Sequence, residues 1–282
     1  MMAPEAAEAM VELYCRALKM PTLRKGFRQV LRDSQLGGAS MSEFLSSCLA
    51  HEVEGRHQSA MTARMKQARF PAVKTLDSFD FAAVPGLDRN RILGLADGSF
   101  IREHENVVLL GNSGLGKTHL AIALGVRAIQ AGYRVRFATV PVLVQELMQA
   151  EREFRLPKLM KAWSGIDLVI IDELGYVSLG PGGPLLFQFL AQRYEQSSVL
   201  VTSNLEFSRW AEVFGDVTMT AALLDRLTHH VHLFVLTGQS YRLKPSKGQP
   251  EGIVTARGAP PTVSYTNLAL PTILRCACRG AS

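Results

Sequence analysis

The sequence predicts an α/β fold in which a parallel central sheet is flanked by helices, preceded by a small all-helical N-terminal domain. Short apolar runs, such as residues 107–110 and 168–171, are typical of strands that are buried on both faces of a sheet. Helical patterns separate these runs, as the crossover connections between parallel strands require. Before residue 70, β-branched runs are few and apolar residues recur at spacings of three and four, which indicates helices.

The N-terminal helices are predicted to occupy residues 1–70, with breaks at Pro21 and at a pair of glycines. Ser40 and Glu43 have the spacing of a capping box, in which each side chain binds the backbone N–H of the other residue at the start of a helix. A basic helix is expected to follow. Residues 71–86 are rich in proline, glycine and aspartate, and they predict a linker.

Strands and helices then alternate through a second predicted domain, residues 87–248. After residues 107–110, the predicted strands are 134–138, 168–171, 199–202 and 231–236, and the predicted helices are 117–131, 141–161 (interrupted at Pro157) and 184–196. Residues 249–282 are rich in proline, glycine and threonine without a sustained period, so they predict a poorly ordered extension.

The composition is that of a globular protein, with 47% apolar and 20% charged residues. No apolar run approaches the roughly 20 residues of a membrane helix, and the N-terminus lacks the pattern of a secretory signal. The four cysteines (Cys15, Cys48, Cys276 and Cys278) do not resemble a disulfide framework, so we expect a reducing, cytoplasmic location. The net charge of +6 is concentrated at the ends, which permits nucleic-acid contact without requiring it.

The strongest functional signal is a P-loop pattern, G-x4-G-K-T, directly after the first predicted strand. It consists of Gly111, Asn112, Ser113, Gly114, Leu115, Gly116, Lys117 and Thr118. The glycines let successive backbone N–H groups point at phosphate oxygens, at the positive end of the following helix. The ammonium group of Lys117 can reach the β- and γ-phosphates, and the hydroxyl of Thr118 can bind Mg²⁺. The pattern therefore predicts binding of ATP with Mg²⁺.

A second signal lies at the end of the apolar run 168–171, where Asp172 and Glu173 are the first polar residues. Ligands of open parallel sheets bind at the carboxyl ends of the strands. We expect Asp172 to hold Mg²⁺ and Glu173 to deprotonate the attacking water. Asn204 follows the strand 199–202 and is a candidate to bind the γ-phosphate or the water, although Ser-Asn after a strand is by itself more often a turn.

Three other features leave alternatives open. Arg226 is either a surface residue or an arginine supplied to the γ-phosphate of a neighbouring subunit, where a planar guanidinium stabilises phosphoryl transfer. The histidine-rich run 229–232 lacks cysteine or acidic partners at ligand spacing, so a zinc site is not favoured. Cys276 and Cys278 lack a matching second pair, so a metal site is not favoured there either.

Together these motifs resemble the IstB family, the ATP-binding transposition helpers of bacterial insertion sequences and relatives of the DnaC helicase loader within the AAA+ class. The resemblance spans residues 10–248. It rests on GNSGLGKTHLA from residue 111, IIDELGY from 170, LFQ from 186, RYE from 193, TSN from 202, FGD from 214, LDRL from 224 with the two following histidines, and G-x-SYRLK from 238. Members of the family usually stop shortly after the SYRLK run, so the residues from 249 onward have no counterpart there.

The resemblance implies a role for each position that matches a family motif. These positions are Lys117 and Thr118 in Walker A, Asp172 and Glu173 in Walker B, Asn204 as sensor 1, Arg226 as the arginine finger and Arg242 as sensor 2. It also implies that the basic stretch within residues 141–161 contacts DNA, with a solvated basic face as an equal alternative. The basic residues of this stretch are Arg152, Arg155, Lys158 and Lys161.

The family further implies a homo-oligomer that assembles on duplex DNA in the ATP state and works with an IstA-like transposase, without a membrane. The N-terminal domain would serve assembly and partner binding. A DnaC-type replicative helicase loader is the nearest alternative, since it shares the motor. A small-molecule P-loop kinase would need an acceptor pocket and a lid of arginines, and the Asp172–Glu173 pair argues against an inactive DNA-binding switch.

Overall fold

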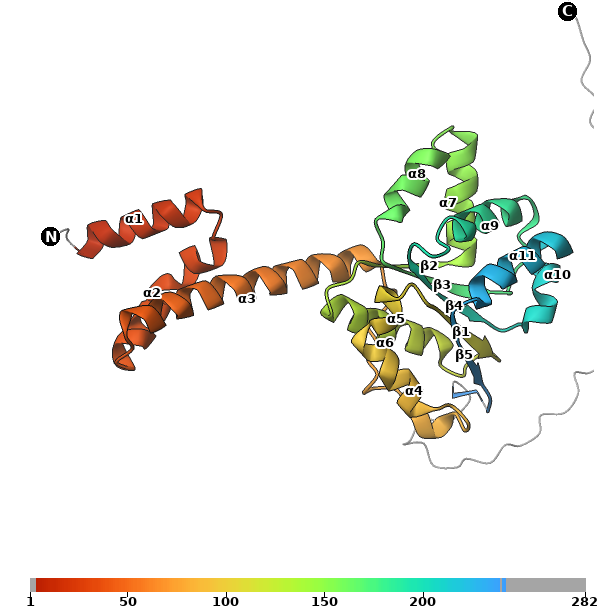
Figure 1. The fold of residues 1–282 in the computed structure, drawn as a ribbon, viewed down its shortest axis with the longest axis horizontal. Helices are drawn as coiled ribbons and strands as arrows, with labels where there is room; N and C mark the ends of the chain where they lie inside the picture. The colour runs from red at the N-terminus through yellow and green to blue at the C-terminus, as the bar shows by residue number, and fades with distance from the viewer. Residues whose placement is uncertain (1–3, 239, 242–282) are drawn as a thin grey trace, which may run out of the picture. The chain divides into compact units, whose positions relative to one another are not determined.

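Five parallel strands form the central sheet of the computed structural model, which describes residues 4–238, 240 and 241. They lie in the order β2-β3-β4-β1-β5 (Figure 1). The strands are β1 (Asn106–Gly111), β2 (Val135–Thr139), β3 (Leu168–Leu174), β4 (Ser198–Ser203) and β5 (Val231–Leu236). Each coincides with a predicted strand, and all neighbours pair in parallel, which confirms the predicted α/β fold.

The strand order brings the motif-bearing segments to one edge of the sheet. β4 lies between β1 and β3, and Ser203 of β4 is in register with both Leu110 of β1 and Leu174 of β3. Because all strands run in the same direction, the loops that follow them emerge at the same edge. The P-loop, the acidic pair and Asn204 therefore follow three adjacent strands.

Helices cover both faces of the sheet, as the alternation of side chains along each strand requires. Val107 and Leu109 belong to the core on the face of α6 (Lys117–Gln130), whereas Val108 and Leu110 belong to the core on the opposite face. The opposite face is covered by α7 (Val140–Arg152), α9 (Gly183–Ala191) and α11 (Val217–Thr228) (Figure 1). The shorter helices are α4 (Arg89–Gly94), α5 (Ser99–Arg102), α8 (Leu156–Ser164) and α10 (Trp210–Phe214), with 3₁₀ turns at Phe81–Ala83, Leu95–Asp97, Gly180–Gly182 and Phe207–Arg209.

Three N-terminal helices, α1 (Pro4–Ala17), α2 (Pro21–Leu36) and α3 (Met41–Ala68), share a small core of their own. The predicted capping box is present at the start of α3, where Ser40 N donates to Glu43 Oε2 at 2.7 Å and Glu43 N donates to Ser40 Oγ at 3.3 Å. The prediction of a separate basic helix was wrong, because α3 continues without a break to Ala68. The helix ends where Arg69 adopts a left-handed conformation with φ of 58°.

The segment 71–86, predicted as a linker, packs against the sheet. Leu76 and Val84 are buried in the same core as α6. All the described residues belong to one compact unit, so the predicted boundaries at residues 70, 86 and 248 stay predictions. The predicted extension, including Cys276 and Cys278, lies outside the described residues.

The helix predicted over residues 141–161 is two helices, and the break precedes Pro157. Phe154 takes a left-handed φ of 56°, and the N–H groups of Phe154 and Arg155 bind the carbonyls of Glu151 and Ala150, which closes the end of α7. Pro157 lies in the first turn of α8, where its missing N–H costs nothing. The helix predicted over 184–196 also ends earlier, at Ala191.

Among the residues that the structure describes, no helix is both long enough and apolar enough to span a membrane.

Candidate active site

The P-loop joins β1 to α6 through a backbone that only glycine tolerates well. Gly111, Gly114 and Gly116 have φ values of 143°, 83° and 88°. A side chain at position 111 would also clash with the carbonyl oxygen of Leu236 in β5. The glycines therefore allow the loop to curl while it remains packed against the neighbouring strand.

Lys117 begins α6 and is only 7% exposed. Its Nζ donates hydrogen bonds to the carbonyl oxygens of Gly111 at 2.6 Å and Asn112 at 2.8 Å. The ammonium group consequently lies inside the curl of the loop. A positive charge is therefore present where the loop would surround an anion.

Thr118 connects the P-loop helix to the acidic pair. Its Oγ1 lies 3.0 Å from both carboxylate oxygens of Asp172, which is 3% exposed at the end of β3. Thr202 of β4 donates to the same carboxylate at 2.5 Å. Hydroxyl and carboxylate oxygens are the ligands that Mg²⁺ prefers, together with phosphates and water, so Thr118 and Asp172 fit a magnesium site.

Glu173 has a different environment from the adjacent Asp172. The pairing of β3 with β4 shifts register between Ile171 and Leu174, and Glu173 takes a φ of 67° within this irregularity. Its N–H donates to Thr202 Oγ1 at 3.1 Å, and its side chain is exposed. Such a bulge redirects one side chain out of the sheet pattern, and positive φ at a non-glycine residue is a local strain that is common at functional sites.

Asn204 lies beside the turn that follows the acidic pair. A Cβ atom on Gly175 would come within 2.7 Å of the Asn204 Oδ1, so only glycine leaves room for this amide. Within the described residues, the buried Oδ1 atom accepts no hydrogen bond. An unpaired buried acceptor costs about 1–3 kcal/mol, which a ligand or a water molecule would offset by donating a hydrogen bond.

Arg226 does not lie with these residues. The carbonyl of Leu227, the next residue in α11, accepts a hydrogen bond at 3.2 Å from the side chain of Asn106, the first residue of β1. The P-loop follows Gly111, the last residue of β1. The five intervening steps along a strand correspond to about 16 Å, so this end of α11 is at the opposite edge of the sheet from the P-loop.

The basic residues of the predicted DNA-binding stretch are exposed. Arg152 ends α7, Arg155 lies in the following turn, and Lys158 and Lys161 lie on α8. Arg155 forms an ion pair with Glu153, so its charge is partly offset. Arg242, the predicted sensor 2, lies outside the described residues.

One wall of the P-loop was not predicted from the sequence. Phe79 lies so close to Gly116 that a Cβ atom there would approach its ring to 2.6 Å, and its ring centroid is 5.3 Å from that of His119. His119 Nε2 lies 3.0 Å from the carbonyl oxygen of Thr75. The sequence signal was the pair of phenylalanines, Phe79 and Phe81, within the predicted linker.

A second contact that was not predicted comes from the segment after β5. Tyr241 N donates to the carbonyl oxygen of Gly114 at 3.0 Å, and a Cβ atom on Gly114 would clash with Ser240. The first two residues of the SYRLK run therefore reach the P-loop, and the distance along the chain concealed this contact.

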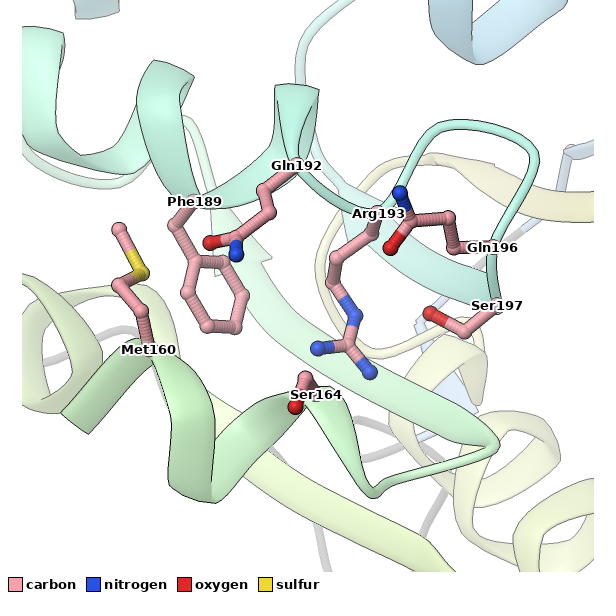
Figure 2. A pocket seen from close by; sticks show the side chains of 7 residues that line it. All are labelled: Met160, Ser164, Phe189, Gln192, Arg193, Gln196 and Ser197. Atoms are coloured by element: carbon pink, nitrogen blue, oxygen red, sulfur yellow. The ribbon is translucent and has the colours of Figure 1, made fainter. Parts of the chain in front are cut away.

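Arg193, from the RYE run, lies away from this site and binds backbone carbonyls inside the fold. It is 5% exposed and donates to the carbonyl oxygens of Trp163 at 3.0 Å and Ile166 at 2.8 Å, at the end of α8. Figure 2 shows its guanidinium directed toward Ser164, beside a cavity of about 20 Å³. Burial lowers the pKa of Arg193 to about 10. A cavity of this size holds a water molecule rather than a nucleotide.

Comparison with known proteins agrees with the resemblance. The family model for IstB-like ATP binding proteins matches residues 14–249. A protein named as the putative ATP-binding protein of insertion sequence IS21, from Pseudomonas aeruginosa, is 42% identical over 251 residues, which are 89% of this chain and 94% of that protein. Its counterpart from insertion sequence IS5376 of Geobacillus stearothermophilus is 39% identical over 239 residues, 84% of this chain and 95% of that protein.

A solved structure has the same fold over part of its length. AMPPCP-bound DnaA from Aquifex aeolicus aligns with a TM-score of 0.50 and 17% identity, over 59% of this chain and 50% of that chain. The chain thus spans about half of that DnaA chain, and the likeness concerns the fold alone. It agrees with the predicted α/β fold with a parallel central sheet.

Proposed function

The chain belongs to the IstB-like ATP-binding proteins of insertion sequences, and from this premise we propose that it hydrolyses ATP, assembles on duplex DNA in its ATP state and assists a partner transposase in the cytoplasm. The contact between Thr118 Oγ1 and both carboxylate oxygens of Asp172, at 3.0 Å, carries this proposal. It joins the P-loop to the acidic pair, which are the two parts that an ATP-hydrolysing motor needs.

Phosphate binding would require little rearrangement. The Nζ of Lys117 would exchange the carbonyls of Gly111 and Asn112 for phosphate oxygens. Thr118 and Asp172 would hold Mg²⁺, which neutralises phosphate charge when it is bound. The backbone N–H groups of the loop would bind the remaining oxygens.

In the proposed hydrolysis, a water oxygen forms a bond to the γ-phosphorus while the bond to the β–γ bridging oxygen breaks. The exposed carboxylate of Glu173 accepts the proton of the water and later returns it to phosphate. The unpaired Oδ1 of Asn204 would accept the second proton of the same water in a hydrogen bond and so orient it. A general base of this kind contributes about 10²–10⁴-fold to the rate.

We assign Arg226 to the γ-phosphate of a neighbouring subunit. Its position at the opposite edge of the sheet from its own P-loop supports action between subunits. A guanidinium there would neutralise the charge that develops on the transferred phosphoryl group, an effect worth about 10³–10⁵-fold in related motors. ATP would then favour assembly, because the bound γ-phosphate attracts the neighbour.

The exposed residues Arg152, Arg155, Lys158 and Lys161 are the proposed contacts to duplex DNA, through neutralisation of backbone phosphates. The N-terminal helices are proposed to bind the transposase or to support assembly. Their separate small core is consistent with a module that carries its own partner surface.

The test measures ATP hydrolysis with duplex DNA, with single-stranded DNA and without DNA, for the wild type and for Glu173→Gln, with light scattering in parallel. We expect duplex DNA to change the rate, Glu173→Gln to abolish hydrolysis, and ATP to drive assembly on the duplex. A monomer that hydrolyses ATP but ignores duplex DNA would retain the motor and contradict the transposition role. A response to single-stranded DNA alone, with binding to a hexameric helicase, would favour a helicase loader.

A further inference from the structure

Arg226 lies over an aromatic ring, as Arg89 and Arg91 also do. Its guanidinium carbon lies 5.5 Å from the centroid of the Phe187 ring on α9. Within the described part of the chain, Arg226 forms no salt bridge and donates no hydrogen bond. By contrast, Arg134 and Arg209 bind the carboxylates of Asp167 and Glu212 at 2.9 and 2.8 Å.

Stacking on a ring has a different consequence from pairing with a carboxylate. The five N–H donors of a guanidinium lie in its plane, and an aromatic ring attracts its face. The ring of Phe187 therefore restricts the orientation of Arg226 without occupying a donor. A carboxylate partner would occupy two donors and neutralise the charge that a phosphate needs.

Both halves of this pair are anchored in the core. Phe187 is half-buried and packs against the core between the sheet and α9. In α11, Leu223 and Leu227 flank Arg226 and are 1% and 4% exposed. The helix and the ring are thus held by the same core, so the side chain of Arg226 is the mobile part that stacking can restrict.

We propose that Phe187 is a positioning residue, which holds the guanidinium of Arg226 in a fixed plane with its donors free for the γ-phosphate bound to a second copy of this chain. This inference rests on the proposed function, which assigns Arg226 to the neighbouring subunit. The new element is Phe187, which orients the side chain of Arg226 before the subunits assemble. A side chain that is already oriented loses less rotamer freedom when it binds the phosphate.

A complementation assay isolates the effect of Phe187. The acceptor subunit carries Arg226→Ala with an intact nucleotide site, and the donor subunit carries Glu173→Gln with an intact Arg226. Neither hydrolyses ATP alone, whereas mixed assemblies hydrolyse ATP at acceptor sites that face a donor. Phe187→Leu and Phe187→Tyr are then introduced into the donor only, so the nucleotide site that is measured is never altered.

We expect a Phe187→Leu donor to lower the rate about fivefold, the value of a typical cation–π contact at an exposed site. Phe187→Tyr retains the ring and should restore the rate. Tyr133→Leu is the matched control, because Tyr133 is also partly buried but packs against the core on the other face of the sheet, away from Arg226, and it should leave the rate unchanged. The affinity of the acceptor for ATP and the assembly measured by light scattering should be the same with each donor.

Three results would overturn the inference. A Phe187→Leu donor as active as the unmodified donor would show that stacking does not matter, while the proposed function would stand. A Phe187→Leu donor that fails to assemble would indicate a packing role instead. If the Arg226→Ala acceptor hydrolyses ATP alone, Arg226 is not required; the inference and the assigned role of Arg226 would then fall together, but the ATPase assignment would not.

Discussion

Two buried carboxylates, one in the N-terminal helices and one in the nucleotide site, show how differently the same group is used. Glu52 of α3 and Asp172 of β3 are each 3% exposed. Glu52 accepts hydrogen bonds from the backbone N–H groups of Thr22 and Leu23, both at 2.9 Å, and from Arg56 at 2.8 Å. Its charge is therefore compensated by a helix N-terminus and a guanidinium.

Asp172 has no such compensation. Its described partners are the neutral hydroxyls of Thr118 and Thr202, and it forms no salt bridge with a described residue. A buried charge with only neutral partners is costly, and a cation would relieve that cost. The difference teaches that the fold supplies a counter-charge for Glu52, whereas the described salt bridges supply none for Asp172.

The largest effect expected from this difference is on activity. Asp172→Asn should lower ATP hydrolysis by about 10³-fold or more, because the amide provides no charge for Mg²⁺. The free energy of unfolding should stay the same or rise by about 1 kcal/mol, since the substitution removes the uncompensated charge while the amide oxygen still accepts a hydroxyl hydrogen bond. Steady-state hydrolysis and urea unfolding measure the two quantities. A large loss of stability would mean that Asp172 resembles Glu52 after all.

Arg193 extends the comparison to a buried cation, whose hydrogen bonds stabilise the fold. Arg193→Met should reduce the free energy of unfolding by about 2–4 kcal/mol, because the carbonyls of Trp163 and Ile166 lose their donors. Arg134→Ala is the control, since Arg134 is 57% exposed and its pair with Asp167 should contribute about 1 kcal/mol or less. Equal effects of the two substitutions in urea unfolding would contradict the structural role of Arg193.

The pKa of the buried Glu52 carboxyl leads us to expect that the free energy of unfolding depends on pH. Burial alone raises the pKa of the Glu52 carboxyl, but hydrogen bonds from Arg56 and from the backbone of Leu23 and Thr22 outweigh it, so the pKa lies below its ordinary value. The resulting stabilisation is present above the pKa of the unfolded chain and is lost as the pH falls through the lower, folded value.

Glu52→Gln should therefore destabilise the N-terminal helices by about 1–2 kcal/mol at neutral pH and flatten the loss of stability in acid. Hydrogen exchange of α2 and α3 as a function of pH would measure this change. Glu54→Gln is the control, because Glu54 is exposed and accepts only from Gln58 among the contacts described. An unchanged acid profile for Glu52→Gln would refute the assignment.

The smallest expected effect concerns DNA. Lys158→Ala should weaken duplex binding equally for all sequences and reduce the slope of log affinity against log salt concentration by about 0.9, as the loss of one phosphate contact does. Arg102→Ala, on α5 with 71% of its side chain exposed, should leave the slope unchanged. Identical slopes for both variants would indicate that the basic face of α8 is solvated and does not contact DNA.

Much of the fold could be predicted because the information is local. Each strand is a short run of apolar residues, and the capping box of Ser40 and Glu43 depends on residues three apart. The P-loop is equally local, since eight consecutive residues contain its glycines, its lysine and its threonine. The predicted interruption of the helix 141–161 is confirmed, but it lies before Pro157, because the conformation of Phe154 had already ended α7.

The sequence by itself determined the parallel α/β fold and the chemical groups of the site, because apolar periodicity and motif spacing are properties of neighbouring residues. Only the tertiary structure decided how these groups are oriented. The positive φ of Glu173, the stacking of Arg226 on Phe187 and the approach of Phe79 to Gly116 depend on segments that are distant in sequence. Packing of the sheet and its helices brings those segments together, and no local pattern encodes that packing.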